Sequence, residues 1–480
     1  MVTHRCTRLA LLLIIASLLA ACTANSPRRY AADCSQAPLS RPASASPIET
    51  VAASSAQDSY VLGFVELDDQ GHLYCRNQMN DVVGRLRTEA AQRDVLMVVF
   101  VHGWRHDDKP DDENLKTFRV LLDGLVADEH ALADSERAPR RVVGVYVAWR
   151  GMSLTPPGLQ YLTFWDRKNT AATIGHGDVT EVLTRLEQVK REKDDRVGQD
   201  SATRLVIIGH SFGGLIVHTA LSQIMVSRFV RTGGPPVQYG GPARPPTEPE
   251  PGDDDEIQVQ GFGSLVVLIN PAFEAQLFSS LSDISAEHAH YARDQAPLMA
   301  VMTSEADSAT GILFPMGRRV STLFENTRTM TRWNATTGQL ESINESEAII
   351  TSVGHFLPYR THRLYPRPDR PERKPDPANR ELRAESMMDA SRLRDTVSAA
   401  EGWTGDSPGS KISFRDVVLE RTENSAGRNP YLVINVDKRL IASHGDLGNP
   451  GIRSFIKDLV LISTVPPPEK KRLFLRFNAM

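Results

Sequence analysis

Short apolar stretches alternate with amphipathic stretches along most of the chain. The apolar stretches are nearly continuous runs of Val, Ile, Leu and Met, which is typical of strands buried on both faces of a parallel sheet. In the amphipathic stretches, apolar residues recur at intervals of three and four, which predicts helices. The predicted strands cover residues 95–101, 142–148, 205–208, 265–269, 298–302 and 431–436, and the predicted helices cover residues 113–128, 178–194, 214–229 and 452–462. This alternation predicts an α/β fold with a mostly parallel central sheet flanked by helices.

Two segments interrupt the alternation. Residues 233–256 are rich in Gly and Pro and end in an acidic run, a composition typical of a disordered loop. Residues 313–410 contain several prolines among charges, then a helical pattern over residues 381–400, and we expect them to form a cap or insertion. Residues 151–177 are apolar and aromatic. They are expected either to form a lid with residues 313–365 or to be ordinary connecting structure.

An N-terminal β-hairpin is predicted ahead of these elements. Residues 60–67 are rich in β-formers and lead through a turn into residues 72–74. Order is expected to begin near Tyr60, because the preceding residues are rich in Ala, Ser and Pro and have no hydrophobic period. We therefore expect one α/β domain over residues 58–480, preceded by a flexible tether over residues 22–57.

The first 21 residues have the organisation of a secretory signal. Arg5 and Arg8 precede a 13-residue run of apolar and small residues, which is shorter than the roughly 20 residues that a membrane-spanning helix needs. The run ends in Leu-Ala-Ala-Cys at Cys22, which resembles the lipobox of bacterial lipoproteins. The resemblance implies that residues 1–21 are removed and that Cys22 carries a diacyl lipid. The alternative is an ordinary signal peptide that is cleaved nearby.

This resemblance also implies a location in the bacterial cell envelope. Lipid on Cys22 would anchor the protein to a membrane, and more than one acyl chain makes such an anchor stable. Thr23 rather than Asp follows the cysteine. By similarity to lipoprotein sorting in enteric bacteria, this favours the outer membrane, with the protein facing the periplasm.

The distribution of cysteines limits the chemistry of the remaining chain. Cys6, Cys22, Cys34 and Cys75 are the only four cysteines. Cys34 and Cys75 stay in the mature chain, in an oxidising compartment where we expect them to form a disulfide; two buried thiols are the alternative. Because no later thiol and no CxxC zinc pattern occur, we expect no metal site and no cysteine nucleophile. The net charge of −4 excludes a strongly basic nucleic-acid binder.

The clearest chemical motif is Gly209-His210-Ser211-Phe212-Gly213. It directly follows a predicted strand and opens a predicted helix, the context in which G-x-S-x-G forms a nucleophile elbow. Both glycines are needed, because larger side chains two residues from the strained nucleophile would clash with the neighbouring strand and helix. Ser211 Oγ would then lie at a helix N-terminus, where the helix dipole stabilises developing negative charge. We therefore predict that Ser211 is a nucleophile; a glycine-rich turn without chemistry is the alternative.

With this elbow the chain resembles the α/β-hydrolase superfamily, in particular bacterial serine esterase-like or lipase-like lipoproteins. The resemblance covers roughly residues 58–232, 257–365 and 411–480. Besides the elbow it rests on Phe64-Val65-Glu66, His102-Gly103-Trp104, Ser304-Glu305-Ala306-Asp307 and His444. It implies the α/β-hydrolase fold and a triad in the chain order serine, acid, histidine. It also implies that the backbone amides of Trp104 and Phe212 form the oxyanion hole, with His102 bracing the first of these loops.

The same resemblance indicates an acid and a base. Asp307 follows the predicted strand 298–302 and is the expected acid, with Glu305 and then Glu274 as alternatives. His444 follows the last predicted strand and is the expected base, with His355 as the alternative. A serine needs such a base, and the base needs an orienting acid.

Together these residues predict two-step acyl transfer through an acyl-enzyme. The expected protein is a membrane-anchored carboxylic-ester hydrolase that acts on a small acyl ester or a lipid, without a cofactor and without a nucleic-acid partner. An acyltransferase or a peptidase would use the same triad. A non-catalytic envelope scaffold is the alternative from a different class, and it would not need all three triad residues.

Overall fold

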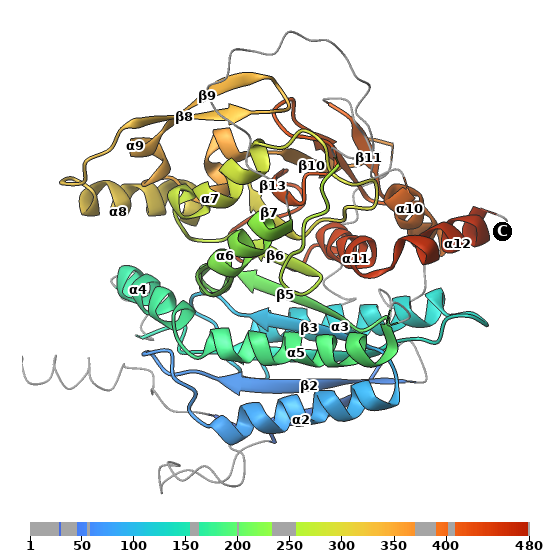
Figure 1. Cartoon of the computed structure of the whole chain (residues 1–480). Helices are drawn as coiled ribbons and strands as arrows, with labels where there is room; N and C mark the ends of the chain where they lie inside the picture. Colours follow the sequence, from blue (N-terminus) through green and yellow to red (C-terminus); the bar gives the residue numbers. More distant parts are fainter. Residues whose placement is uncertain are drawn as a thin grey trace, which may run out of the picture.

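The computed structural model describes residues 28–29, 46–54, 58–153, 163–198, 201–232, 256–369, 390–401 and 409–478. Within these residues an 11-stranded sheet has the order β1-β2-β4-β3-β5-β6-β7-β13-β10-β12-β11 (Figure 1). Its strands are β1 (Ile48–Ala52), β2 (Ser59–Glu66), β3 (Val95–Val101), β4 (Arg141–Ala148), β5 (Arg204–His210), β6 (Leu265–Ile269), β7 (Met299–Ser304), β10 (His362–Pro366), β11 (Lys411–Ser413), β12 (Val417–Arg421) and β13 (Tyr431–Val436).

The strands from β2 to β10 in this order run parallel, and β1, β12 and β11 pair antiparallel at the two ends of the sheet. The arrowheads of β2, β3 and β5 point to the left in Figure 1, so the carboxyl edge of the sheet lies on that side. Every residue of β3 is buried. Its side chains alternate between two hydrophobic clusters, with Met97 and Val99 in one and Leu96, Val98 and Phe100 in the other. Two covered faces explain why this strand is a continuous apolar run.

Helices cover both faces of the sheet. One hydrophobic cluster contains residues of α2 (Arg76–Gln92), α4 (Phe164–Gly175), α5 (Val179–Val197), α6 (Phe212–Thr232) and α7 (Ala275–Ala286). The other contains residues of α3 (Glu113–Leu132) and α11 (Pro450–Thr464). A third, smaller cluster joins the ends of α3 and α11 to α10 (Ala390–Glu401) and α12 (Pro467–Asn478). The core therefore lies in two layers, one on each side of the sheet.

Polar side chains fix the starts of two of these helices. Asp112 accepts hydrogen bonds from the amides of Asn114 and Leu115 and caps α3. Asn449 caps α11 by accepting from the amide of Gly451, and Pro450 occupies the first helical position, where its missing N–H costs nothing. The structure thus confirms helices over the predicted residues 113–128 and 452–462, and it extends both of them.

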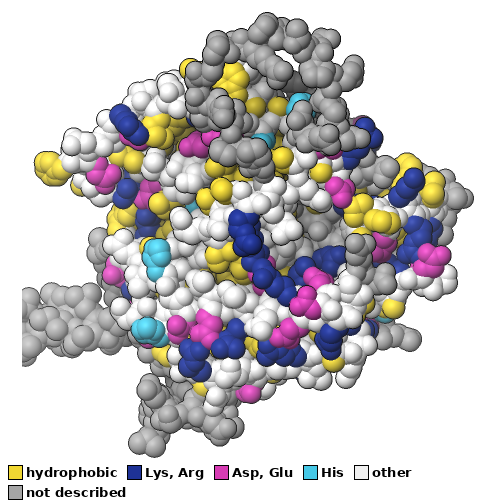
Figure 2. Space-filling view, in the orientation of Figure 1, with side chains coloured by type: hydrophobic (Ala, Val, Ile, Leu, Met, Phe, Trp, Pro, Cys, Tyr) yellow, Lys and Arg dark blue, Asp and Glu magenta, His cyan; other side chains and the backbone are white. Residues whose placement is uncertain are grey.

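A small lobe follows β7 and lies at the top left of Figure 1. It contains the π-helix η4 (Ala309–Leu313), α8 (Phe314–Ser321), the separate hairpin β8 (Thr329–Asn334) and β9 (Gln339–Asn344), α9 (Glu345–Ala348), and the 3-10 turns η5 (Val353–His355) and η6 (Leu357–Tyr359). Figure 2 shows hydrophobic side chains at the surface around α8 and at the tip of the loop that follows it.

The α/β architecture is confirmed, and the predicted buried strands and helices are present. The structure corrects the expectation that order begins near Tyr60, because β1 already pairs with β2 at residues 48–52. The N-terminal antiparallel pair is formed by β1 and β2, whereas residues 60–67 and 72–74 meet only at the isolated bridge between Leu67 and Leu73. β1 is a short edge strand, so it needs pairing on one side only.

The two expected insertions fall differently on the structure. Residues 233–255 and 370–389 lie outside the described residues. Within the segment 313–410, β10 joins the main sheet between β13 and β12, and α8, β8 and β9 stay outside that sheet. Residues 154–162 of the expected lid segment lie outside the described residues, and the described remainder contains α4.

Candidate active site

Ser211 lies between β5 and α6 with a left-handed backbone, at φ +55°, which is uncommon for a residue with a side chain. Three neighbouring glycines allow this turn. A Cβ on Gly213 would lie 2.0 Å from the carbonyl oxygen of Val101, one on Gly209 would lie 2.7 Å from the oxygen of Gly213, and one on Gly103 would lie 2.7 Å from Ser211 Cβ. The predicted elbow geometry is therefore present at Ser211, and β3, β5 and α6 meet there.

His444 lies between Ser211 and Asp307. Its Nε2 is 2.6 Å from Ser211 Oγ, and its Nδ1 is 2.9 Å from both carboxylate oxygens of Asp307. In this arrangement the serine hydroxyl donates to Nε2 while Nδ1–H donates to the carboxylate. Ser211 follows β5, Asp307 follows β7 and His444 follows β13. In the sheet β7 and β13 are neighbours, and only β6 lies between β5 and β7. The structure thus brings together residues that are far apart in the sequence.

The acid is buried and well supplied with donors. Asp307 accepts hydrogen bonds from the amides of Ala309 and Thr310 and from the Thr310 hydroxyl. Burial acts to raise the pKa of Asp307, but the hydrogen bonds and charge of His444, together with Thr310, outweigh it and hold the pKa below its usual value. Asp307 is therefore maintained as a carboxylate facing His444.

The alternative acids and base lie elsewhere. Glu305 accepts a hydrogen bond from Asn435 at 2.7 Å. Glu274 forms ion pairs of 2.7 Å with both Lys168 and Arg318. His355 lies behind the acid, with its Nε2 3.1 Å from the Thr310 hydroxyl. In the described contacts these three side chains support the loops around the site, and Asp307 is the carboxylate that meets His444.

Two buried residues hold the loop of His444 from behind. The backbone carbonyl of His444 accepts hydrogen bonds from His210 Nε2 at 3.0 Å and from Asn270 Nδ2 at 2.9 Å. Burial lowers the pKa of His210 to about 3, so its ring is neutral. Asn270 also accepts from the amide of Ser304, at the end of β7. Asn270 therefore connects the histidine loop to the acid loop, a role that sequence reasoning missed.

The two expected oxyanion-hole residues belong to the two segments that meet at the serine, the loop after β3 and the start of α6. Phe212 is the first residue of α6, where amides have no intrahelical partner. Trp104 lies in the loop after β3, and both aromatic rings contact Phe164, at centroid distances of 5.2 Å and 5.0 Å. The bracing role of His102 is confirmed. Its Nδ1 donates to the carbonyl of Gly103, and its Nε2 accepts from the backbone amide of Trp149, directly after β4. Burial lowers the pKa of His102 to about 4.

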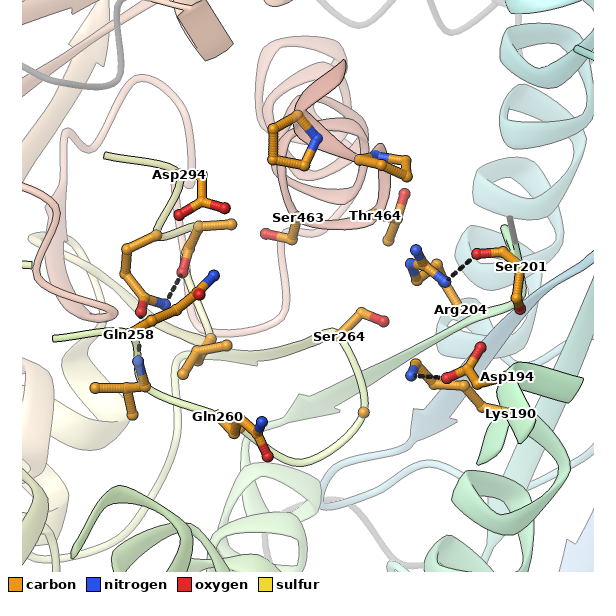
Figure 3. Close-up of a pocket in the computed structure, with 18 of the residues that line it drawn as sticks. Lys190, Asp194, Ser201, Arg204, Gln258, Gln260, Ser264, Asp294, Ser463 and Thr464 are labelled. Carbon is orange, nitrogen blue, oxygen red and sulfur yellow. Dashed lines mark hydrogen bonds and ion pairs between the residues drawn. The ribbon is translucent and has the colours of Figure 1, made fainter. Parts of the chain in front are cut away.

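A hollow of about 1120 Å³ lies at the opposite, amino edge of the sheet (Figure 3). It is lined by polar and charged side chains from β5, α5, α6 and the turn between α11 and α12. Arg204 donates to the carbonyls of Ser201 and Thr203, and Lys190 pairs with Asp194 at 2.6 Å. The described lining of this hollow contains no residue of the serine–histidine–aspartate constellation.

Several sequence predictions concern residues beyond this site. Cys22 and Cys34 lie outside the described residues, whereas Cys75 is buried just before α2, so the lipid and the disulfide stay predictions. None of the described helices is long and apolar enough to cross a membrane. Among the described residues we find no group of three or more His, Cys, Asp or Glu placed to hold a metal ion.

Comparisons with known proteins give one family. The alpha/beta hydrolase family matches residues 98–399. A search of curated proteins found no significant match. Among solved structures, the chain is weakly similar to an uncharacterized protein from Pseudomonas aeruginosa, at 10% identity and a TM-score of 0.19. That match covers 51% of this chain and 42% of the other, so it spans less than half the length of that protein.

Proposed function

The chain belongs to the alpha/beta hydrolase family, whose match spans more than half of its length, and from this premise we propose that it is a serine hydrolase that cleaves carboxylic esters. The observation that carries the proposal is the pair of hydrogen bonds made by His444, one to Ser211 Oγ and the other to the buried carboxylate of Asp307. A serine is a weak nucleophile unless a base removes its proton, and the base needs an orienting acid.

In the first step, Ser211 Oγ attacks the acyl carbonyl while its proton moves to His444 Nε2. Asp307 holds the imidazole in the tautomer that can accept this proton and stabilises the positive charge that forms. When the tetrahedral intermediate collapses, His444 returns the proton to the leaving alcohol and Ser211 keeps the acyl group. Water then repeats the sequence, releasing the carboxylic acid and restoring the serine.

The tetrahedral intermediate carries its negative charge on the former carbonyl oxygen. The backbone amides of Phe212 and Trp104 are the proposed donors to this oxygen. Placement of the Phe212 amide in the first turn of α6 supports this role, because amides there lack intrahelical partners and the helix dipole favours negative charge. The aromatic side chains of Trp104, Phe164 and Phe212 supply an apolar wall beside the serine.

Active-site labelling with a fluorophosphonate tests this proposal. The probe should form a covalent adduct with the parent protein, and Ser211→Ala should abolish both the adduct and hydrolysis of a nitrophenyl ester. Ser321→Ala removes an exposed serine on α8 and is the matched control, expected to label like the parent. Absence of labelling in the parent, or equal labelling of Ser211→Ala, would contradict the assignment.

We also propose that the mature protein is anchored by lipid on Cys22, in the bacterial outer membrane and facing the periplasm, and that Cys34 pairs with Cys75. The Leu-Ala-Ala-Cys ending of the N-terminal apolar run supports the anchor, and two or more acyl chains would make it stable. The burial of Cys75 just before α2 is compatible with a disulfide there. Mass spectrometry of the N-terminal peptide and of the Cys75 peptide checks both proposals.

A further inference from the structure

The helix α8 and its flanks expose an unusually apolar surface. Met316 is 60% exposed, Val320 is 72% exposed and Phe324 is 99% exposed. Met316 and Val320 are four residues apart and share one face of α8, Ile312 lies in the π-helix that precedes α8, and Phe324 lies in the turn that follows it. Contiguous exposed apolar side chains on a folded domain mark a surface that contacts something else. Figure 2 shows this surface at the left of the molecule, around α8 and the loop after it.

The opposite face of α8 is already packed against the domain. Phe314 is fully buried, and its ring lies 5.8 Å from that of Trp165 on α4. A Cβ on Gly317 would lie 1.9 Å from the Trp165 ring, so the glycine allows the two helices to approach closely. The exposed apolar stripe is therefore not the side of α8 that packs on the core, since that side is already buried.

This surface is connected to the candidate active site on two sides. The π-helix η4, which leads directly into α8, includes Thr310, whose amide and hydroxyl bond to Asp307. On the other side, the ring of Phe164 contacts both Trp165 and Phe212, so aromatic side chains lead from α8 to the residue after the serine. A partner that binds the stripe would thus lie next to the acyl-transfer site.

The N-terminal part of the chain indicates where a membrane would be. The backbone amides of Arg28 and Arg29 donate to the carboxylate of Glu66 at 2.5 Å and 2.9 Å, and Arg28 Nε pairs with Asp108 at 2.8 Å. The Arg29 guanidinium lies 3.4 Å from the centre of the Phe64 ring. Glu66 ends β2 and Asp108 follows β3, so these two arginines are fixed at the carboxyl edge of the sheet.

Only a short piece of chain separates that point from the proposed anchor. Cys22 precedes Arg28 by six residues, and six residues span at most about 20 Å when fully extended. A lipid on Cys22 therefore keeps the carboxyl end of β2 within about 20 Å of the bilayer, and α8 follows β7 at the same edge of the sheet. The amino edge, with its polar hollow, lies on the far side of the sheet.

We propose that the exposed stripe of α8 rests on the phospholipid surface to which Cys22 anchors the protein, so that the active site faces the bilayer. Exposed Arg319 on the same helix suits the phosphate groups of lipid headgroups, and a helix with an apolar face and basic residues is the pattern that binds in the plane of a membrane interface. The proposal rests on the proposed lipid anchor and deepens the proposed function, because ester substrates would enter from the bilayer.

Fluorescence quenching by brominated lipid tests the contact directly. The full lipidated protein is reconstituted in vesicles of phosphatidylethanolamine and phosphatidylglycerol, with or without bromine on the acyl chains. A fluorophore on Phe324→Cys should be quenched by the brominated lipid, whereas one on Leu475→Cys should not. Leu475 is the matched control, because it is 61% exposed and lies on α12, whose first residues line the hollow at the amino edge. The labelled parent gives the background.

Lack of quenching at position 324, or equal quenching at both positions, would overturn the contact with lipid. A fluorophore that is shielded from water without being quenched would show that a second copy of the chain covers the stripe, which also overturns it. Fluorophosphonate labelling of the same samples keeps the two proposals apart: an unlabelled but quenched protein refutes the hydrolase, and a labelled but unquenched one refutes the docking.

A pair of charge substitutions gives an independent measurement. Val320→Asp combined with Phe324→Asp should lower the rate on an ester embedded in vesicles by about tenfold, because two apolar side chains no longer enter the bilayer. The rate on a water-soluble ester should not change, since neither residue touches the triad. Leu475→Asp should leave both rates at the parent value. Equal rates of the double variant and the parent on the embedded ester would contradict the proposal.

Discussion

At the carboxyl edge of the sheet, Ser211 holds a left-handed backbone within hydrogen-bond distance of His444, and exposed apolar side chains surround the lobe beside it. At the amino edge, a polar hollow of about 1120 Å³ is lined by ion pairs and by an arginine that bonds to backbone carbonyls. The two edges belong to the same strands. They differ in how closely the backbone segments approach one another and in what their side chains can do.

Glycines show this difference most directly. Gly213 at the carboxyl edge has no room for a Cβ, because the carbonyl oxygen of Val101 would lie 2.0 Å away. Gly198 at the amino edge has open space around it and is distinguished only by its φ of +72°. At the first position, glycine permits two segments to pack together around a nucleophile. At the second, it only ends a helix. Close backbone packing together with hydrogen-bonded titratable groups is what separates the site from an ordinary polar hollow.

The largest effect is expected from removing the charge that orients His444. Asp307→Asn keeps the shape of the side chain, but its amide can donate to Nδ1 and so favours the wrong imidazole tautomer. We expect kcat to fall by about 10⁴-fold, as when the acid of a serine–histidine–aspartate triad is neutralised. The measurement is the steady-state rate on a nitrophenyl ester, with circular dichroism to show that the fold is retained.

Glu305→Gln is the matched control for that substitution. Glu305 lies two residues from Asp307 and bonds to Asn435 rather than to the histidine, so its neutralisation should leave kcat within about twofold. If Glu305→Gln lost activity and Asp307→Asn did not, the acid would be misassigned and the carboxyl-edge geometry would need another explanation.

Much of this edge could be predicted from the sequence because its requirements are local. The nucleophile elbow needs glycines at fixed positions beside Ser211, and a strand must precede it. Asp307 and His444 follow predicted strands, and they are assigned through the resemblance to α/β-hydrolases, which implies the chain order serine, acid, histidine. The elbow therefore depends on a short segment whose conformation is set by its own residues, whereas the acid and the base depend on the fold that the resemblance implies.

The parts that sequence reasoning missed depend on pairing between distant segments. Asn270 is one polar residue after a strand, and its role follows from the position of β6 between β5 and β7. β10 ends in a proline and is interrupted by Arg363, so it lacks a continuous apolar run; its place follows from pairing with β13 and β12. His355 contacts Thr310 across the small lobe. Nothing within these segments indicates which distant strand or loop each would meet.

A smaller effect is expected when the two glycines are compared by substitution. Gly213→Ala forces a methyl group against the Val101 carbonyl and should lower the free energy of unfolding by about 2–3 kcal/mol, the cost typical of overpacking. Gly198→Ala meets no neighbour, so the positive-φ backbone alone is unfavourable, at about 1–2 kcal/mol. Urea unfolding of both variants measures the difference. Equal losses would show that the two edges do not differ in packing.

The smallest effect concerns the pH dependence of two buried carboxyls, one near each edge. At the carboxyl edge, burial and the nearby charge of Asp108 raise the pKa of Glu66 to about 7. Near the amino edge, burial is outweighed by Arg140 and Arg137, which lower the pKa of Glu129 to about 2. Opposite shifts give opposite dependences of stability on pH, because stability rises with pH only where the unfolded chain binds more protons.

For Glu66, the folded chain binds more protons than the unfolded chain between the ordinary carboxyl pKa of 4.5 and about 7. Its contribution is therefore fully present below pH 4.5 and is lost as the pH rises through 7. Glu66→Gln should flatten the decline in unfolding temperature across this range. Above its ordinary pKa of 4.5, Glu129 is ionised in both the folded and the unfolded chain, so Glu129→Gln should lower the unfolding temperature at those pH values without changing the slope. A slope altered by Glu129→Gln and not by Glu66→Gln would reverse the assignment of the two carboxyls and, with it, the electrostatic contrast between the edges.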